Sequence, residues 1–163
     1  MNAIDTWKSA GEAGDAAAAL TALTEDAELV SPLTARFRFR GADEIGPLLT
    51  AAFEVLSDYR YETDLRGDRE AHLTARALVR GVELHELQHL ELDRDGLIRT
   101  ITVAMRPLPA ITAFAREMGP LLAAEWGAPG AARRLRFAGA FLDSVASTGD
   151  RTFIPLAAPP RAR

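Results

Sequence analysis

Apolar and polar side chains alternate along the middle of the chain, with the two-residue period of a β-strand that buries one face. Turn sequences at Gly67-Asp68, at Gly81 and at Asp93-Arg94-Asp95-Gly96 divide this region into strands. The predicted strands are 59–65, 71–80, 82–92 and 97–106, preceded by two shorter ones at 27–31 and 36–40. Short turns between successive strands predict an antiparallel sheet.

The flanking regions show the longer period of amphipathic helices. Helices are predicted at 3–13, 16–23 and 43–56 before the long strands, and at 111–125 and 131–145 after them. The helix at 111–125 is expected to be interrupted near Gly119-Pro120. Helices and strands segregated in this way indicate an α+β domain, in which a curved antiparallel sheet and its helices enclose an apolar pocket.

The predicted organisation is a core domain at 1–106 and a helical C-terminal extension at 107–163 that packs on the same domain. The extension serves either as a lid over the pocket or as an element of a dimer contact, and Trp126 and Phe137 are the expected points of contact.

Composition narrows the possible partners. The 163 residues are 48% hydrophobic and 26% charged, with a net charge of −4, so no basic field is present to attract nucleic acid or anionic lipid. There is no cysteine, which excludes disulfides and thiol catalysis. The first residues lack the pattern of a signal peptide, and no apolar run approaches the roughly 20 residues of a membrane span. We therefore expect a cytoplasmic protein without membrane or nucleic-acid partners.

Three segments resemble the opening of a SnoaL-like domain, and a fourth resembles the turn before its last strand. They are Gly14-Asp15, Thr24-Glu25-Asp26-Ala27-Glu28-Leu29-Val30-Ser31-Pro32, Arg40-Gly41-Ala42-Asp43-Glu44-Ile45 and Asp93-Arg94-Asp95-Gly96-Leu97-Ile98. This fold is shared with nuclear transport factor 2, ketosteroid isomerase, limonene epoxide hydrolase and scytalone dehydratase. The resemblance reaches to about residue 106 and implies a cone-shaped sheet, with a homodimer formed through its outer face. It implies little about function, because the fold hosts enzymes, binding proteins and scaffolds.

The resemblance also gives candidate site positions. The catalytic carboxylate of the isomerases falls on Ser31, which is a poor general base, and their oxyanion-hole residues fall on Trp7 and Gln88. The residues that position water in the epoxide hydrolases correspond to Glu86-x-Gln88, with Ile101 and Val103 opposite, so that catalytic set is absent. Steroid-type proton abstraction and epoxide hydrolysis by the known residue sets are both disfavoured.

Strand alternation and the same alignment assign the residues of the pocket. The expected lining is Leu48, Phe53, Tyr61, Leu73, Ala75, Leu90, Ile101, Val103 and Met105. Arg99 is placed on this face, where it either binds a ligand carboxylate or enolate or reaches solvent at the sheet edge. Glu86 is a candidate acid or base if it points inward near Gln88. The alternative is that helix side chains fill the space and no pocket remains.

His85-Glu86-Leu87-Gln88-His89 matches the zinc-protease motif H-E-x-x-H. The motif binds zinc on a helix, where residues four apart are neighbours. The turn sequences on either side predict a strand, on which the two histidines lie about 13 Å apart. We therefore predict no metal site here, and expect His72, His85 and His89 on the outer face of the sheet, in packing or in a dimer interface.

The preferred hypothesis is a SnoaL-like, polyketide cyclase-like protein that acts on a small hydrophobic organic molecule without a cofactor. Isomerisation, cyclisation or dehydration is the expected reaction class, with Trp7, Ser31, Gln88 and Arg99 as the catalytic candidates. The alternative is a non-catalytic ligand-binding or dimeric scaffold protein. A zinc peptidase is a remote third possibility that requires the helix at residues 85–89.

Overall fold

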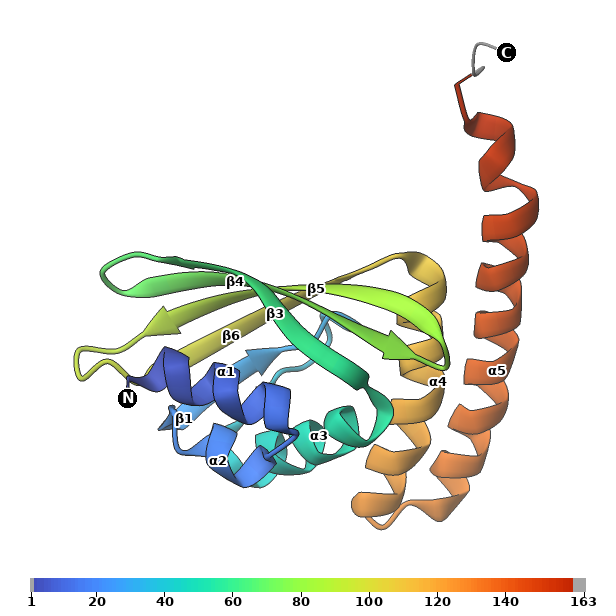
Figure 1. The fold of residues 1–163 in the computed structure, drawn as a ribbon. Coiled ribbons are helices and arrows are strands. Elements are labelled where there is room, and N and C mark those ends of the chain that lie inside the picture. The colour runs from blue at the N-terminus through green and yellow to red at the C-terminus, as the bar shows by residue number, and fades with distance from the viewer. Residues whose placement is uncertain (1, 160–163) are drawn as a thin grey trace.

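The computed structural model describes residues 2–159, and Met1 and residues 160–163, including the end of the predicted extension, lie outside the described part. Helices and strands segregate along the chain, as the sequence predicts (Figure 1). The helices are α1 (Ala3–Ala13), α2 (Ala16–Leu20), α3 (Gly41–Val55), α4 (Leu108–Glu125) and α5 (Pro129–Thr152), followed by a 3₁₀ turn at Ile154–Ala157. The strands are β1 (Leu23–Val30), β2 (Phe39–Arg40), β3 (Ser57–Arg66), β4 (Glu70–Val79), β5 (Val82–Leu92) and β6 (Ile98–Arg106).

The six strands form one curved sheet in the order β2-β1-β6-β5-β4-β3. Strands β3 to β6 are joined by short turns and pair antiparallel, as predicted. However, β1 pairs with β6 in parallel, so the sheet is mixed and not wholly antiparallel. The reason is topological: α3 and the four strands β2 to β5 separate β1 from β6, and this long connection returns the chain to the same end of the sheet.

Capping residues set the first two helices. The Asn2 side chain accepts a hydrogen bond from the Asp5 amide, and Gly14 ends α1 in the left-handed conformation, with φ of 69°. Asp15 then caps α2 by accepting from the Ala18 amide. α2 ends at Leu20, before the predicted end at residue 23, because a turn at residues 21–22 leads directly into β1.

The predicted strand at 36–40 is reduced to the two residues of β2. Its register pairs Glu28 with Arg40 and Leu29 with Phe39, which would place residues 36–38 opposite residues 30–32. Since β1 ends at Val30 and Pro32 lacks an amide hydrogen, the ladder cannot continue. Residues 31–38 instead form a loop that borders the pocket described below.

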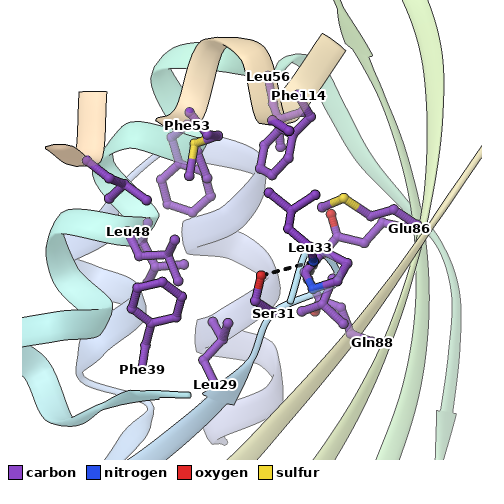
Figure 2. A pocket seen from close by; sticks show the side chains of 18 of the residues that line it. Leu29, Ser31, Leu33, Phe39, Leu48, Phe53, Leu56, Glu86, Gln88 and Phe114 are labelled. Carbon is purple, nitrogen blue, oxygen red and sulfur yellow. Dashed lines mark hydrogen bonds between the residues drawn. The ribbon is translucent and has the colours of Figure 1, made fainter. Parts of the chain in front are cut away.

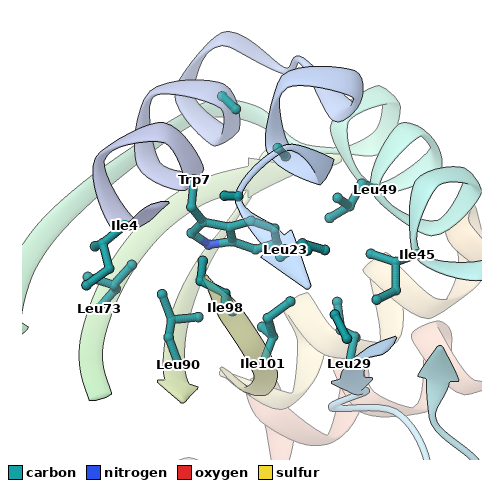
Figure 3. Close-up of a cluster of buried hydrophobic side chains, with 14 of the residues drawn as sticks. Ile4, Trp7, Leu23, Leu29, Ile45, Leu49, Leu73, Leu90, Ile98 and Ile101 are labelled. Atoms are coloured by element: carbon teal, nitrogen blue, oxygen red, sulfur yellow. The ribbon is translucent and has the colours of Figure 1, made fainter. Parts of the chain in front are cut away.

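Helices α1 to α3 cover the inner face of the sheet and bury the main hydrophobic core (Figure 3). Trp7 of α1 lies above Leu90, Ile98 and Ile101 of the sheet, and Ile45 of α3 packs toward Leu29. Leu90, Ile98 and Ile101 are fully buried. This packed region occupies one part of the cone, so the pocket lies beside it.

The C-terminal residues form a hairpin of two long helices. α4 packs against α3 and the sheet, where Ala113, Phe114 and Met118 bury a second core with Val79 and Leu84. α4 is continuous through Pro120, contrary to the predicted interruption, because packing against neighbours on both sides holds the helix in spite of one lost hydrogen bond.

The last helix, α5, packs along α4 and projects beyond the outer face of the sheet (Figure 1). It runs to Thr152, which is seven residues beyond the predicted end. Phe137, expected as a point of contact, is largely exposed, whereas Trp126 packs partly against Phe39. Among the described residues, no helix has the length and apolar character that crossing a bilayer requires.

Candidate functional site

A cavity of about 270 Å³ lies between the inner face of the sheet, α1, α3, the loop at 31–38 and α4 (Figure 2). Its wall is formed almost wholly of apolar side chains. The lining residues are Trp7, Gly11, Ala19, Leu29, Ser31, Pro32, Leu33, Thr34, Phe37, Phe39, Leu48, Leu49, Ala52, Phe53, Leu56, Tyr59, Tyr61, Glu86, Gln88, Val103, Met105, Phe114, Ala115, Met118, Gly119, Leu122 and Leu135. The volume lies near the lower end of the range for ligand pockets, so it suits a small molecule.

Polar groups gather at one place on this wall, around the buried side chain of Gln88. Its Oε1 accepts hydrogen bonds from Trp7 Nε1 at 2.8 Å and from the Tyr61 hydroxyl at 3.2 Å. Its Nε2 donates to the Tyr59 hydroxyl at 3.1 Å and to Glu86 Oε1 at 2.6 Å. Trp7 can only donate, which fixes the orientation of the amide. With two bonds accepted and two donated, Gln88 holds its neighbours in place and has no hydrogen left for a ligand.

Glu86 is the only carboxylate among the described residues that line the cavity. It lies on β5 two residues before Gln88, so strand alternation points both side chains into the cone. Burial among apolar groups raises the pKa of Glu86 from its ordinary 4.5 to about 7, although hydrogen bonds from Gln88 and Tyr59 oppose the shift. Because this pKa lies near neutral pH, the carboxyl can either give or take a proton.

The two tyrosines remain protonated beside it. Burial, and then the nearby Glu86 charge, raise the pKa of Tyr59 well above its ordinary value, and the same causes raise the pKa of Tyr61. Their rings meet edge to face, with centroids 5.3 Å apart. Tyr59 and Tyr61 thus act as hydrogen-bond donors and not as bases.

Ser31 directly follows β1 and lines the cavity as the first residue of the loop at 31–38 (Figure 2). Its Oγ accepts a hydrogen bond from the Leu33 amide at 3.1 Å. That bond leaves the hydroxyl hydrogen for a ligand oxygen. The Ser31 hydroxyl is therefore available as a hydrogen-bond donor, and a serine is a weak general base.

The structure brings together many of the residues singled out in the sequence. Trp7, Ser31 and Gln88 line the cavity, as do the apolar residues Leu48, Phe53, Tyr61, Val103 and Met105. The remaining expected lining residues are buried elsewhere. Leu73, Leu90 and Ile101 belong to the core under α1 and α2, because Trp7 and the helix side chains fill that end of the cone. Ala75 packs with Tyr59 and Ala77, since the large tyrosine ring covers it.

Arg99 lies outside the pocket, contrary to one of the two expectations for it. Leu92 pairs with Ile98 and Glu91 pairs with Thr100, so a β-bulge leaves Arg99 as an extra residue. The bulge turns Ile98 inward and leaves Arg99 exposed. Arg99 is therefore removed from the catalytic candidates.

Sequence reasoning missed the part of the wall contributed by distant segments. The α4 residues Phe114, Met118 and Leu122 close one side, and Leu33 and Phe37 of the loop close another. The α4 residues could have been found from the helical period of residues 111–125, since the apolar face of an amphipathic helix packs against the rest of the protein. The loop residues carried no such signal, because an isolated apolar side chain beside a proline is common on surfaces.

The H-E-x-x-H sequence lies within β5, which confirms the predicted strand. His85 and His89 therefore sit on the outer face, on the side opposite Glu86 and Gln88. This geometry excludes a single zinc ion bridging them in the manner of a metalloprotease.

Neither a protein-family model nor a curated protein matches the sequence. Several solved structures, however, match the fold of this chain. A steroid delta-isomerase from Pseudomonas aeruginosa superposes with a TM-score of 0.70 at 26% identity, over 77% of this chain and 92% of that one. A SnoaL-like protein of unknown function from Burkholderia thailandensis gives 0.54 at 19% identity, over 63% and 90% of the chains. The chain has the fold of the SnoaL-like and nuclear transport factor 2-like superfamily.

A further structural neighbour is the epoxide hydrolase/cyclase-like enzyme SalBIII, described for pyran ring formation in the polyether salinomycin. It superposes with a TM-score of 0.53 at 13% identity, over 64% of this chain and 88% of that one. The neighbours thus include an isomerase and a cyclase-like enzyme, and the superposed regions leave part of this chain unmatched.

Proposed function

We propose that this SnoaL-like protein binds a small, mainly apolar organic molecule in the cavity and transfers a proton on it without a cofactor. Glu86 is the proposed general acid and base. The reaction class is isomerisation, cyclisation or dehydration, in which a proton leaves one atom and arrives at another. The observation that supports this most directly is that Glu86 is the one carboxyl among the described residues that line a mainly apolar cavity.

Two properties of Glu86 suit that role. A general acid or base is most effective when its pKa lies near the working pH, and burial brings the pKa of Glu86 to about 7. The surrounding apolar side chains also exclude water, which strengthens the interaction between the carboxyl and a polarised ligand group.

The neighbouring polar groups support the carboxyl in different ways. Gln88 positions it through the 2.6 Å bond from Nε2 to Glu86 Oε1. At the start of the loop, the Ser31 hydroxyl can donate to an oxygen of the ligand, where negative charge develops as a proton is removed. Trp7 and Tyr61 act through Gln88 by fixing its amide.

The second candidate is a binding protein without catalytic activity. It is favoured by the saturated Gln88 amide and by Ser31 at the position of the isomerase carboxylate, since both reduce the number of groups that can act on a ligand. The two functions differ in what they require of Glu86, because binding needs only its shape and hydrogen bonds.

Proton transfer to the bound molecule separates these candidates. The molecule is identified by mass spectrometry of the purified protein; if none is retained, a panel of small cyclic ketones is used. Deuterium incorporation from D₂O is then followed by NMR. We expect the E86Q variant to bind the molecule but to incorporate deuterium into it at least about 100-fold more slowly, because a general acid or base usually contributes a factor of this size. The R99A variant is the matched control, because Arg99 lies outside the cavity.

Unchanged exchange in E86Q would exclude Glu86 as the acid or base. Binding without any exchange in the unmodified protein would favour the non-catalytic candidate.

A further inference from the structure

The outer face of the sheet, on the side opposite the cavity, carries a square of four ligand-type side chains. In the register of β4 and β5, His72 pairs directly with His89, and Glu70 pairs directly with Glu91. Because residues two apart in a strand share a face, the histidine pair and the glutamate pair are neighbours on the same surface. All four belong to one hairpin, so their spacing is fixed by the backbone ladder.

Three of these side chains already converge. The imidazole rings of His72 and His89 are stacked, with centroids 4.4 Å apart and planes 7° from parallel. Both Nε2 atoms approach the same carboxylate oxygen, Glu70 Oε2, at 3.9 Å from His72 and 3.0 Å from His89. One ligand atom from each of the three residues lies within 4.8 Å of the others.

That spacing is close to what a metal ion needs. Zinc binds histidine nitrogen and carboxylate oxygen at about 2.0–2.2 Å, which places the ligand atoms of a tetrahedral site roughly 3.3 Å apart. The three side chains are 34–56% exposed, so small rotations can close the remaining gap.

The pairing of Glu70 with Glu91 is a second, independent observation. Like charges directly opposite on neighbouring strands repel and destabilise the pair. A divalent cation bound beside them would offset this repulsion.

We propose that Glu70, His72 and His89 form a site for one divalent transition-metal ion of the zinc class on the outer face of the sheet. Two imidazoles and a carboxylate favour zinc and its neighbours over calcium or magnesium, which prefer all-oxygen ligands. The ion would join β4 to β5 and keep at least one coordination position open for water or for Glu91. The site does not depend on the function proposed for the cavity.

His85 provides a matched internal control. It lies on the same strand and the same face as His89, but four residues away, at about 13 Å. Its cross-strand partners are Arg76 and Arg106, two cations that disfavour a metal ion, and its nearest acidic group is Glu83 at 3.6 Å.

The test is isothermal titration of the metal-free chain with zinc chloride. We expect one zinc per chain. Removing even a supporting contact of a metal ligand costs about 10- to 100-fold in affinity, so H72A and H89A should each lose at least that much. H85A should bind as the unmodified protein does, and circular dichroism of each variant verifies its fold.

A second measurement uses the unmodified chain and does not depend on any variant. In NMR spectra, zinc should shift the ring signals of His72 and His89 and leave those of His85 in place. The proposal is overturned if zinc does not saturate the chain at millimolar concentration, if one zinc is bound by two chains, or if His85 responds as His89 does.

Discussion

At the scale of single residues, the decisive feature is a buried carboxyl, Glu86, whose pKa is raised from 4.5 to about 7. Burial removes water from the Glu86 carboxylate and destabilises its charged form. Hydrogen bonds from Gln88 and Tyr59 offset part of this cost. Residues kept in such an unfavourable environment are commonly functional.

This cost has a measurable pH dependence. The folded-state pKa of Glu86, about 7, exceeds its ordinary value of 4.5. Between these values the folded state therefore binds more protons than the unfolded state, and the contribution of Glu86 to stability falls as pH rises from about 4.5 to 7. The loss amounts to roughly 3 kcal/mol at 1.36 kcal/mol per pKa unit, and is constant above that window.

The E86Q variant should lack this loss. Urea unfolding at pH 4.5 and at pH 8 gives the free energy of unfolding of E86Q minus that of the unmodified protein. This difference should be larger at pH 8 than at pH 4.5. E54Q, at an exposed position on α3, is the control and should show no such change. An equal difference at the two pH values would contradict a neutral buried carboxyl.

At this scale, part of the site could be predicted from the sequence. Strand alternation correctly placed Gln88 on the inner face, and it made Glu86 a conditional candidate. It failed for Arg99, because a one-residue bulge changes which side chains face inward and leaves no mark in the hydrophobic pattern. It also could not show which inward residues border empty space. Leu90 and Val103 both face inward, yet only Val103 lines the cavity.

At the scale of elements, local signals predicted most helices and strands but not the ways in which they pair. Turn sequences located β3 to β6 closely, whereas nothing local indicated that β1 would lie parallel to β6. The predicted interruption of the helix at Gly119-Pro120 was wrong, because tertiary packing of α4 outweighs local propensity.

The close approach of α4 and α5 leaves no room for a side chain at Gly139. A Cβ atom at Gly139 would lie 2.7 Å from the Arg116 Cα, which is backbone and cannot move aside cheaply. The G139A variant should therefore separate the helices and lower stability by about 1–3 kcal/mol, the usual cost of overpacking.

Gly149 is the matched control on the same helix. An added Cβ meets nothing within 4 Å there, so G149A should be neutral or more stable by up to about 1 kcal/mol. Thermal unfolding, with hydrogen exchange of the α4 and α5 amides, measures both. Equal behaviour of the two variants would show that close approach at Gly139 is not required.

At the scale of the whole molecule, the two C-terminal helices differ in what they support. α4 covers a core that includes Val79 and Leu84 of the sheet and also closes the cavity with Phe114 and Met118. Of the α5 residues, only Leu135 is among the described lining of the cavity.

Truncation should separate these roles. A chain that ends at residue 127 should fold with its sheet and most of the cavity wall intact, although the α4 surface under α5 becomes exposed. A chain that ends at residue 107 should lose cooperative unfolding, because the apolar core under α4 would face water. Circular dichroism and the cooperativity of urea unfolding measure this, and cooperative folding of the shorter chain would show that α4 is dispensable.

The parallel pairing of β1 with β6 also has a consequence for the order of folding. Leu29 pairs with Ile101, a partner 72 residues later, so β1 gains that neighbour only after almost two thirds of the chain has been synthesised. During translation, the N-terminal helices and β1 lack the β6 side of the sheet until that strand is made. Strands β3 to β6, in contrast, can form hairpins with strands that are adjacent in the sequence. We expect the site to be completed last, when α4 emerges and docks over a sheet that has already joined its two ends.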